Sequence, residues 1–146
     1  MQRTSQEVTI KALSIVHPGG MRIACGEKTL EIRRWAPELQ PDEDLLIVEN
    51  RRFLHVDGEQ DGDGRAVAVV RVKAVRPFVE QDIAAACASY HEPGWLAWEL
   101  SDVRPVSHAE PVLAARGIYD VQLAPQPLPL DPASVEHQVQ VAPIVR

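Results

Sequence analysis

The residues best suited to chemistry lie within eight positions of one another, where Lys28, Glu31, Arg33 and Trp35 follow a glycine at position 26. Successive residues of a β-strand point to opposite faces, so a strand here would place Glu31, Arg33 and Trp35 on one face, with Lys28 at its mouth. A cation, a carboxylate, a guanidinium and an aromatic ring suit a planar, polar, anionic ligand. A nucleotide fits that description.

These four side chains are compatible with either binding or catalysis. As a cation, Lys28 can hold a phosphate or a carbonyl; in a partly desolvated cleft its pKa would fall, and the neutral amine could act as a base or nucleophile. Arg33 can hold a phosphate or the carbonyl edge of a base, while Glu31 accepts from an exocyclic amine. Trp35 can stack on a base. The alternative is that Lys28 forms a surface pair with a neighbouring glutamate and Trp35 only packs.

The distribution of charge predicts a confined binding site. The net charge of −6 argues against an extended surface for nucleic acid. Residues 10–35, however, carry five basic and two acidic side chains, a local charge of +3. Residues 64–76 carry four basic side chains and no acid, and this second segment adds Arg71 and Lys73 to the candidate ligand-binding residues. The alternative is that these charges only cover solvated strand faces.

Short strands outnumber helices along the chain. Hydrophobic alternation and apolar runs predict strands over residues 8–15, 30–35, 45–48, 66–75, 95–100, 103–106 and 118–123. Helices are expected over residues 21–25 and 80–90, and a flexible acidic turn over residues 57–64. No strand–helix–strand rhythm appears, so the pattern predicts a compact mixed barrel of the α+β class.

This order of segments resembles the ASCH domain family, relatives of the PUA domains. The resemblance covers roughly residues 10 to 124, and its most specific part is the run G-x-K-T-x-E-x-R, which begins at Gly26 and ends at Arg33. It implies a small PUA-like mixed β-barrel with about two flanking helices and a cleft beside that run. It also implies that the chain binds RNA or a modified nucleoside, although some members of the family are hydrolases.

Two departures from the family pattern bear on activity. Many members have a tryptophan after the proline that opens the first helix, whereas this chain has Pro18-Gly19-Gly20, so an aromatic wall is missing and the helix is expected to be mobile. In members that deacetylate acetylated cytidine, a threonine three positions after the lysine is thought to be the nucleophile. Here that position is Glu31, and a carboxylate is a poorer nucleophile toward an amide, so water activated by Glu31 would be required.

Three functions follow from these residues. The leading one is an RNA- or modified-nucleoside-binding module with an electropositive cleft. The alternative is a hydrolase on a nucleic-acid substrate, either an acetylated-cytidine amidohydrolase or a ribonuclease, in which Lys28 and Glu31 are the catalytic pair. Whether the chain is an enzyme stays open. The third is a protein-interaction domain whose proline-rich tail docks on a partner protein. The scattered histidines and two isolated cysteines predict no metal site, and no motif predicts a cofactor.

The composition changes after residue 124. We expect one domain over residues 8–124 and a proline-rich C-terminal tail over residues 125–146, where four prolines fall within eight residues. The tail is expected to be disordered, with an edge strand or an arm that forms a homodimer as the alternative. The chain has no apolar stretch long enough to cross a membrane and no leader-like N-terminus, and its isolated cysteines suit reduced thiols, so we expect a cytoplasmic protein.

Overall fold

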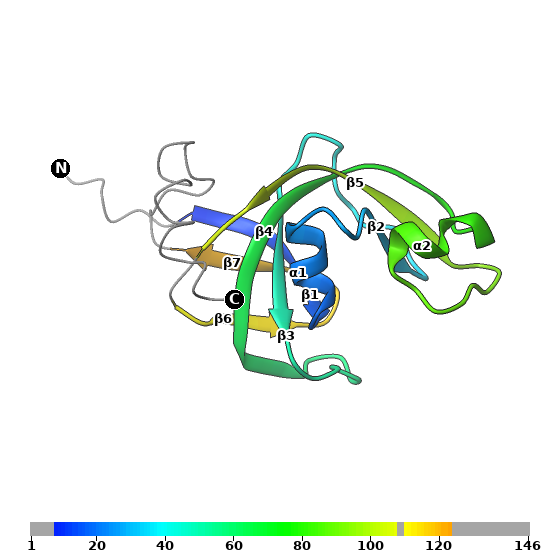
Figure 1. Ribbon diagram of the computed structural model, residues 1–146. Coiled ribbons are helices and arrows are strands. Elements are labelled where there is room, and N and C mark those ends of the chain that lie inside the picture. Colours follow the sequence, from blue (N-terminus) through cyan, green and yellow to red (C-terminus); the bar gives the residue numbers. More distant parts are fainter. Residues whose placement is uncertain (1–7, 108–109, 124–146) are drawn as a thin grey trace.

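The computed structural model describes residues 8–107 and 110–123 (Figure 1). This part of the chain folds into a seven-stranded sheet with two short helices. The strands are β1 (Val8–Val16), β2 (Leu30–Arg33), β3 (Leu45–Asn50), β4 (Gln60–Pro77), β5 (Leu96–Pro105), β6 (Val112–Ala115) and β7 (Ile118–Leu123). The helices are α1 (Gly19–Ala24) and α2 (Ile83–Ala86), and a 3₁₀ turn, η2 (Glu80–Asp82), precedes α2.

The strands pair in the order β2-β5-β4-β3-β1-β7, and β6 pairs with β4 beside this path. The pair β1–β3 is parallel, whereas the other pairs are antiparallel. Within the described residues β2 and β7 end the path and do not pair with each other. The mixed α+β class is therefore confirmed, but the sheet is not closed, and the predicted barrel is not shown.

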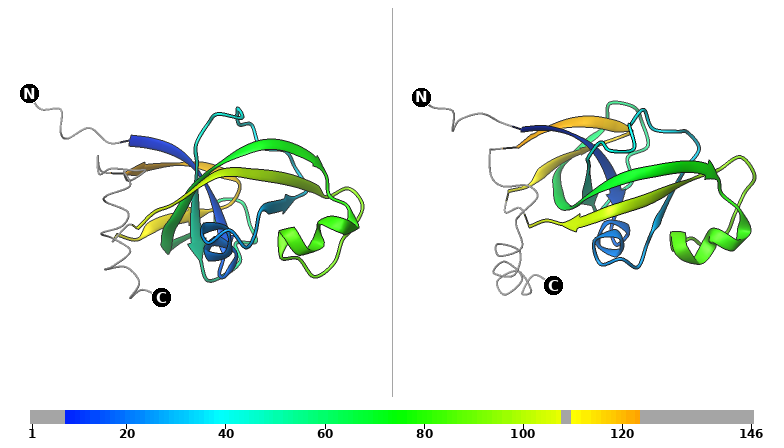
Figure 2. Two further views of the ribbon diagram at one scale, coloured as in Figure 1. Left: turned by 45° about the horizontal axis from the view of Figure 1, so that its top comes forward. Right: turned by 90° about the horizontal axis from the view of Figure 1, so that it is seen from above.

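The long strand β4 joins two parts of the fold (Figures 1 and 2). Its first half pairs with β6 and β3, and its second half pairs with β5 as far as Pro77. The register of β4 against β5 shifts twice, between Val69 and Arg71 and between Val72 and Ala74. Such irregularities bend a strand pair. The curved β4–β5 ribbon carries β2 and α2 at its far end.

Three hydrophobic clusters form the core. The first contains Leu13, Leu45 and Trp98 together with Ile23 of α1, so α1 covers this face of the sheet. The second contains Leu46, Val48 and Val69 among others. The third cluster is smaller and lies at the far end of the ribbon; its buried members are Leu30, Phe78, Ala86 and Ala97. Since parallel and central strands are buried on both faces, continuous apolar runs such as residues 45–48 fit their position in β3.

The structure corrects several predicted elements. Residues 60–64, predicted as part of a flexible turn, belong to β4, and the connection from β3 instead occupies residues 51–59. The strands predicted at 95–100 and 103–106 are one strand, β5, in which Asp102 has a φ of 49°. The short strand β6 was not predicted. The prediction for residues 118–123 is confirmed by β7, and α1 begins two residues before the predicted helix.

The predicted helix at 80–90 is wrong in length, because the helical segment ends at Ala86. Cys87 takes a left-handed conformation with φ 54°, which reverses the chain. The carbonyl of Ala85 accepts a hydrogen bond from the Thr29 N–H at 2.9 Å, and that of Ala86 accepts one from Lys28 Nζ at 2.8 Å. These two carbonyls therefore accept hydrogen bonds from residues just before β2 and not from the backbone N–H groups that a further helical turn would supply.

The remaining predictions on organisation concern parts that the structure does not describe. The proline-rich tail at 125–146, with its predicted disorder or dimer arm, lies outside the described residues. Between residues 8 and 123, leaving out 108–109, the structure contains no helix that is both long and apolar enough to cross a membrane.

Candidate functional site

An open cleft of about 600 Å³ lies at one edge of the sheet. It is lined by residues 14–19, residues 31–33 of β2, residues 50 and 52–54, the end of α2 and the turn between β6 and β7, and Arg22 of α1 also reaches it. Strands β1 and β3 are parallel neighbours, so both end at the same edge of the sheet and bring Ser14 and Asn50 together there. Segments that are far apart in the sequence thus converge on one site.

Lys28 is a buried residue of this cleft. Its Nζ donates to the carbonyl of Leu30 at 2.9 Å and to that of Ala86 at 2.8 Å, and it lies 3.2 Å from Glu31 Oε1. Three acceptors match the full donor capacity of an ammonium group. Lys28 therefore clamps β2 to α2 and orients the carboxylate of Glu31.

Glu31 is buried as well, and it joins Lys28 to Arg33. Its second oxygen, Oε2, accepts a hydrogen bond from Arg33 Nε at 2.7 Å, and Arg33 Nη2 donates to the carbonyl of Ser14 at 3.2 Å. We call these three residues, Lys28, Glu31 and Arg33, the Lys–Glu–Arg row. The pairing that the sequence allowed as a surface contact is thus present, but it is buried. Buried pairs of this kind are far less screened by water than surface pairs.

Trp35 both packs and lines the cleft. Its ring meets that of buried Trp98 edge-on, with the ring centroids 5.1 Å apart, and its carbonyl accepts a hydrogen bond from Trp98 Nε1 at 3.1 Å. The guanidinium carbon of Arg33 lies 6.0 Å from the Trp35 ring centroid. The ring is therefore held in place beside the row and remains partly exposed.

Arg71 and Lys73 do not lie with the other candidates, because neither is among the lining residues of the cleft. Arg71 Nε lies 3.2 Å from Asp44 Oδ1 and 3.6 Å from Asp102 Oδ2. Arg104, followed by Arg71, lowers the pKa of Asp44 by hydrogen bonding to its carboxylate. Acids that are distant in the sequence thus offset the charge of this basic segment. Lys73 is exposed on β4.

Sequence reasoning missed several residues of the cleft. Asn50 is buried at the end of β3, where its Oδ1 accepts from Ser14 Oγ at 3.0 Å and its Nδ2 donates to the Arg52 carbonyl at 2.7 Å. Phe53 lines the cleft from the loop after β3, and Arg116 lines it from the β6–β7 turn. A buried amide at the end of an apolar strand was the one signal available for Asn50. The positions of Phe53 and Arg116 depend on contacts between distant segments.

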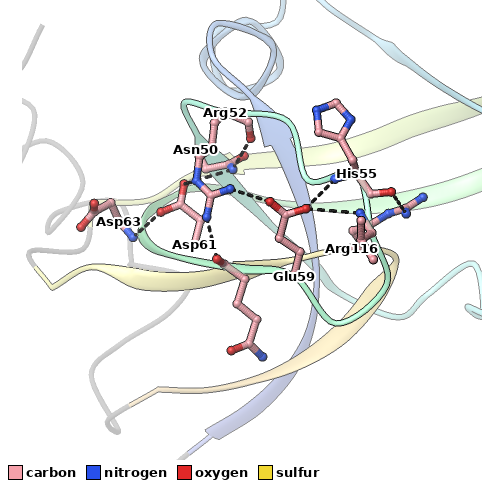
Figure 3. Close-up of polar contacts among 9 residues, drawn as sticks. Asn50, Arg52, His55, Glu59, Asp61, Asp63 and Arg116 are labelled. Atoms are coloured by element: carbon pink, nitrogen blue, oxygen red, sulfur yellow. Dashed lines mark hydrogen bonds and ion pairs between the residues drawn. The ribbon is translucent and has the colours of Figure 1, made fainter.

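The loop after β3 is held by one carboxylate (Figure 3). Glu59 accepts hydrogen bonds from the backbone N–H of His55 at 2.8 Å and of Val56 at 3.2 Å, and from Arg52 Nη1 at 2.7 Å. The His55 N–H first, and then Arg52, lower the pKa of Glu59. From the neighbouring turn, Arg116 Nη1 donates to the His55 carbonyl at 2.5 Å. The loop is therefore fixed from within and from one side.

The start of α1 forms another wall of the cleft. His17 Nδ1 lies 3.1 Å from Glu49 Oε1, and Glu49 Oε2 accepts a hydrogen bond from the Met21 N–H at 2.9 Å. A Cβ added at Gly20 would lie 2.9 Å from Glu49 Cβ, so a glycine lets the helix approach β3 closely. Backbone atoms and the His17 imidazole therefore form this wall of the cleft.

Within residues 8–107 and 110–123, no group of three or more His, Cys, Asp or Glu side chains is arranged to hold a metal ion. The polar side chains that line the cleft carry amide, hydroxyl, imidazole, thiol, indole, guanidinium and ammonium groups and a single carboxylate, that of buried Glu31. This set suits hydrogen bonding to a polar or anionic organic ligand.

Comparison with known proteins gives one family match. The family model of the ASCH domain matches residues 13–110. The crystal structure of the ASCH protein from Zymomonas mobilis is similar, with 16% identity, coverage of 90% of this chain and 94% of that chain, and a TM-score of 0.49. A serine-to-alanine variant of that protein has 14% identity, the same coverage and a TM-score of 0.48. A tyrosine-to-phenylalanine variant has 17% identity, coverage of 66% and 74%, and a TM-score of 0.46.

No curated protein matches the chain. The family match includes α1, the whole Lys–Glu–Arg row and strands β2 to β5, and it spans more than half of the sequence. The chain therefore belongs to the ASCH domain family.

Proposed function

We propose that the chain binds RNA or a modified nucleoside in the cleft described above. The observation that carries this proposal is the Lys–Glu–Arg row, in which two cations share the buried carboxylate of Glu31 and leave a net charge of +1 beside an open cleft of about 600 Å³. The cleft is within the size range of small-molecule sites, and its few fixed polar groups are of the kind that orient a ligand. We place this binding in the cytoplasm.

Arg33 is the residue that we expect to contact the ligand. Its Nε and Nη2 hold Glu31 and Ser14, and the guanidinium is planar, with five N–H donors in all. Donors beyond those two contacts can meet a phosphate or the carbonyl edge of a base. Trp35, fixed beside Arg33, offers a partly exposed ring for stacking. Lys28 and Glu31 act mainly by fixing the position of Arg33. Arg71 and Lys73 are left out of the proposed site.

The matched test compares two arginines of similar exposure. The side chains of Arg33 and Arg104 are 24% and 22% exposed, each contacts a carboxylate at 2.7 Å, and only Arg33 lines the cleft. In a titration of a labelled single-stranded RNA at fixed salt, Arg33→Ala should weaken binding by about 1–3 kcal/mol. Arg104→Ala and Asp63→Ala should leave it nearly unchanged. Equal losses in Arg33→Ala and Arg104→Ala would refute the proposed site.

The hydrolase alternative assigns acid and base roles to Lys28 and Glu31. Binding is better supported, because every donor of the Lys28 ammonium and both oxygens of Glu31 already have partners. We expect no turnover when the pure protein is incubated with acetylated cytidine or RNA and the products are followed by chromatography. Efficient turnover that disappears in Lys28→Ala, but not in Lys11→Ala, would establish the enzyme instead.

A further inference from the structure

Phe53 is an exposed aromatic residue in an unusual position. Its side chain lines the cleft, yet 67% of the residue is accessible to solvent. Val56 belongs to the same loop and is 65% exposed, but it does not line the cleft. The loop thus presents two apolar side chains to solvent, and only the aromatic one faces the proposed ligand. The ring centroid of Phe53 lies 6.2 Å from that of His55.

The loop that carries Phe53 is fixed before any ligand binds. The carboxylate of Glu59 holds two backbone N–H groups and Arg52, and the Val56 carbonyl accepts a hydrogen bond from the Glu59 N–H at 3.0 Å. Arg116 adds a hydrogen bond from the β6–β7 turn (Figure 3). An aromatic ring on a fixed loop loses little conformational entropy when it binds.

The cleft extends from a buried floor to an exposed rim. Lys28, Glu31 and Asn50 are buried, whereas Phe53 and Arg116 are exposed or partly exposed. Arg116 lies 3.5 Å from Asp57, a fully exposed carboxylate, so water and salt screen this pair strongly. A cation and an exposed aromatic ring at the rim of one cleft fit a phosphodiester followed by a base, because proteins bind single strands with stacked aromatic side chains along a basic groove.

We infer that Phe53 stacks on a base adjacent to the nucleotide in the cleft, so that the ligand is a single strand rather than a free nucleoside. This inference rests on the proposed function of the Lys–Glu–Arg row and specifies the class of its ligand. In this arrangement one nucleotide occupies the cleft beside Arg33, the next phosphate lies near Arg116, and the neighbouring base covers the ring of Phe53.

The test uses two probes and a matched pair of variants. A labelled short oligocytidylate is titrated by fluorescence anisotropy, and cytidine monophosphate is measured by competition with it. Phe53→Ala should weaken the oligonucleotide about 5- to 150-fold, the value of one lost base–aromatic stack. It should change the affinity for the mononucleotide less than about twofold. Val56→Ala should change neither affinity. Phe53→Trp should keep the affinity for the oligonucleotide close to that of the wild type.

The outcomes separate this inference from the function on which it rests. If Arg33→Ala weakens the binding of both probes and Phe53→Ala weakens only that of the oligonucleotide, the results support both the proposed function and this inference. Equal oligonucleotide affinities for Phe53→Ala and Val56→Ala overturn the inference alone. Equal losses for both probes in Phe53→Ala also overturn it, because the ring would then contact the nucleotide inside the cleft. A wild-type protein that binds neither probe overturns the RNA-binding form of the proposed function, and this inference with it.

Discussion

Lys28 donates a hydrogen bond from Nζ to the carbonyl oxygen of Ala86, across 58 residues of sequence, at 2.8 Å. This carbonyl belongs to the last residue of α2, whose final carbonyls have no partner within the helix. The Lys28 side chain therefore contacts the last residue of α2, the first residue of β2 and the Glu31 carboxylate at the floor of the cleft. Lys28 is therefore expected to stabilise the fold as well as to line the cleft.

We expect Lys28→Met to destabilise the protein by about 3–5 kcal/mol, the range for removing one partner of a buried ion pair. The substitution keeps the length of the side chain but leaves the carbonyls of Leu30 and Ala86 and one oxygen of Glu31 without their partner. The free energy of unfolding from urea titration, followed by circular dichroism, measures this loss.

The control for this prediction is a second lysine–glutamate pair with the same separation. Lys11 lies 3.2 Å from Glu43, as Lys28 lies from Glu31, but its side chain is 39% exposed rather than 10%. Lys11→Met should cost no more than about 1 kcal/mol, as for other surface pairs. Similar losses in the two variants would show that the clamp formed by Lys28 contributes nothing beyond a surface contact.

A second prediction concerns the close approach of β4 and β6. A Cβ at Gly64 would lie 2.4 Å from the Val112 carbonyl oxygen and 2.7 Å from Val48 Cγ1, whereas a Cβ at Gly62 would meet nothing within 4 Å. Gly64→Ala should therefore lower the free energy of unfolding by about 1–3 kcal/mol through overpacking. Gly62→Ala should change it by less than about 0.5 kcal/mol. The thermal unfolding midpoints of the two variants are measured side by side. Equal midpoints would contradict the close packing of β6 against Gly64.

A third prediction concerns acid stability at the end of the ribbon. The carboxylate of Asp82 accepts hydrogen bonds from Arg76 Nη1 at 2.7 Å, Arg76 Nη2 at 3.1 Å and the Val79 N–H at 3.0 Å. Arg76 and then the Val79 N–H lower the pKa of Asp82 below its ordinary value of 3.8. The stabilisation is therefore complete above about that pH, and it is lost as the pH falls through the lower folded-state value.

Asp82→Asn removes this titration. The wild type should be the more stable protein at neutral pH, and the difference between the two free energies of unfolding should shrink as the pH falls below 3.8. Urea titrations across the acid range test both parts. A difference that stays constant throughout the acid range would show that Asp82 has the same pKa in the folded and unfolded states.

The sequence predicted the parts of the fold that depend on local pattern. Alternation and apolar runs located β1, β3 and β7, and strand periodicity placed Glu31 beside Arg33, which the 2.7 Å contact between their side chains confirms. The length of α2 could not be predicted, because its end is set by hydrogen bonds to Thr29 and Lys28, more than fifty residues earlier. Alanine-rich composition at 80–90 describes only local helix propensity.

The residues that the sequence proposed near β2 lie together in the cleft, whereas those of its rim could not be predicted. Counting charges along the chain added Arg71 to the candidates, but Arg71 does not line the cleft, and its acidic partners, Asp44 and Asp102, come from other segments. The same local counting missed Phe53, because the loop after β3 has no periodicity and is held by contacts of Glu59 and of Arg116, which belongs to a distant segment. Both outcomes depend on contacts between residues that are far apart in the sequence, which local counting does not detect.

The two walls of the cleft are built on different cores, and this has a consequence for motion. The floor, at Lys28 and Glu31, is attached to the small cluster around Leu30 and Phe78, while Asn50 and the loop after β3 are attached to the main sheet. The β4–β5 ribbon connects the two, and its two register shifts lie between them. A ligand that touches both walls would add to the hydrogen bond from Arg33 to the Ser14 carbonyl as a link between these two parts of the fold. Amide hydrogens of β2 and α2 would then exchange more slowly in its presence, although no ligand atom touches most of them.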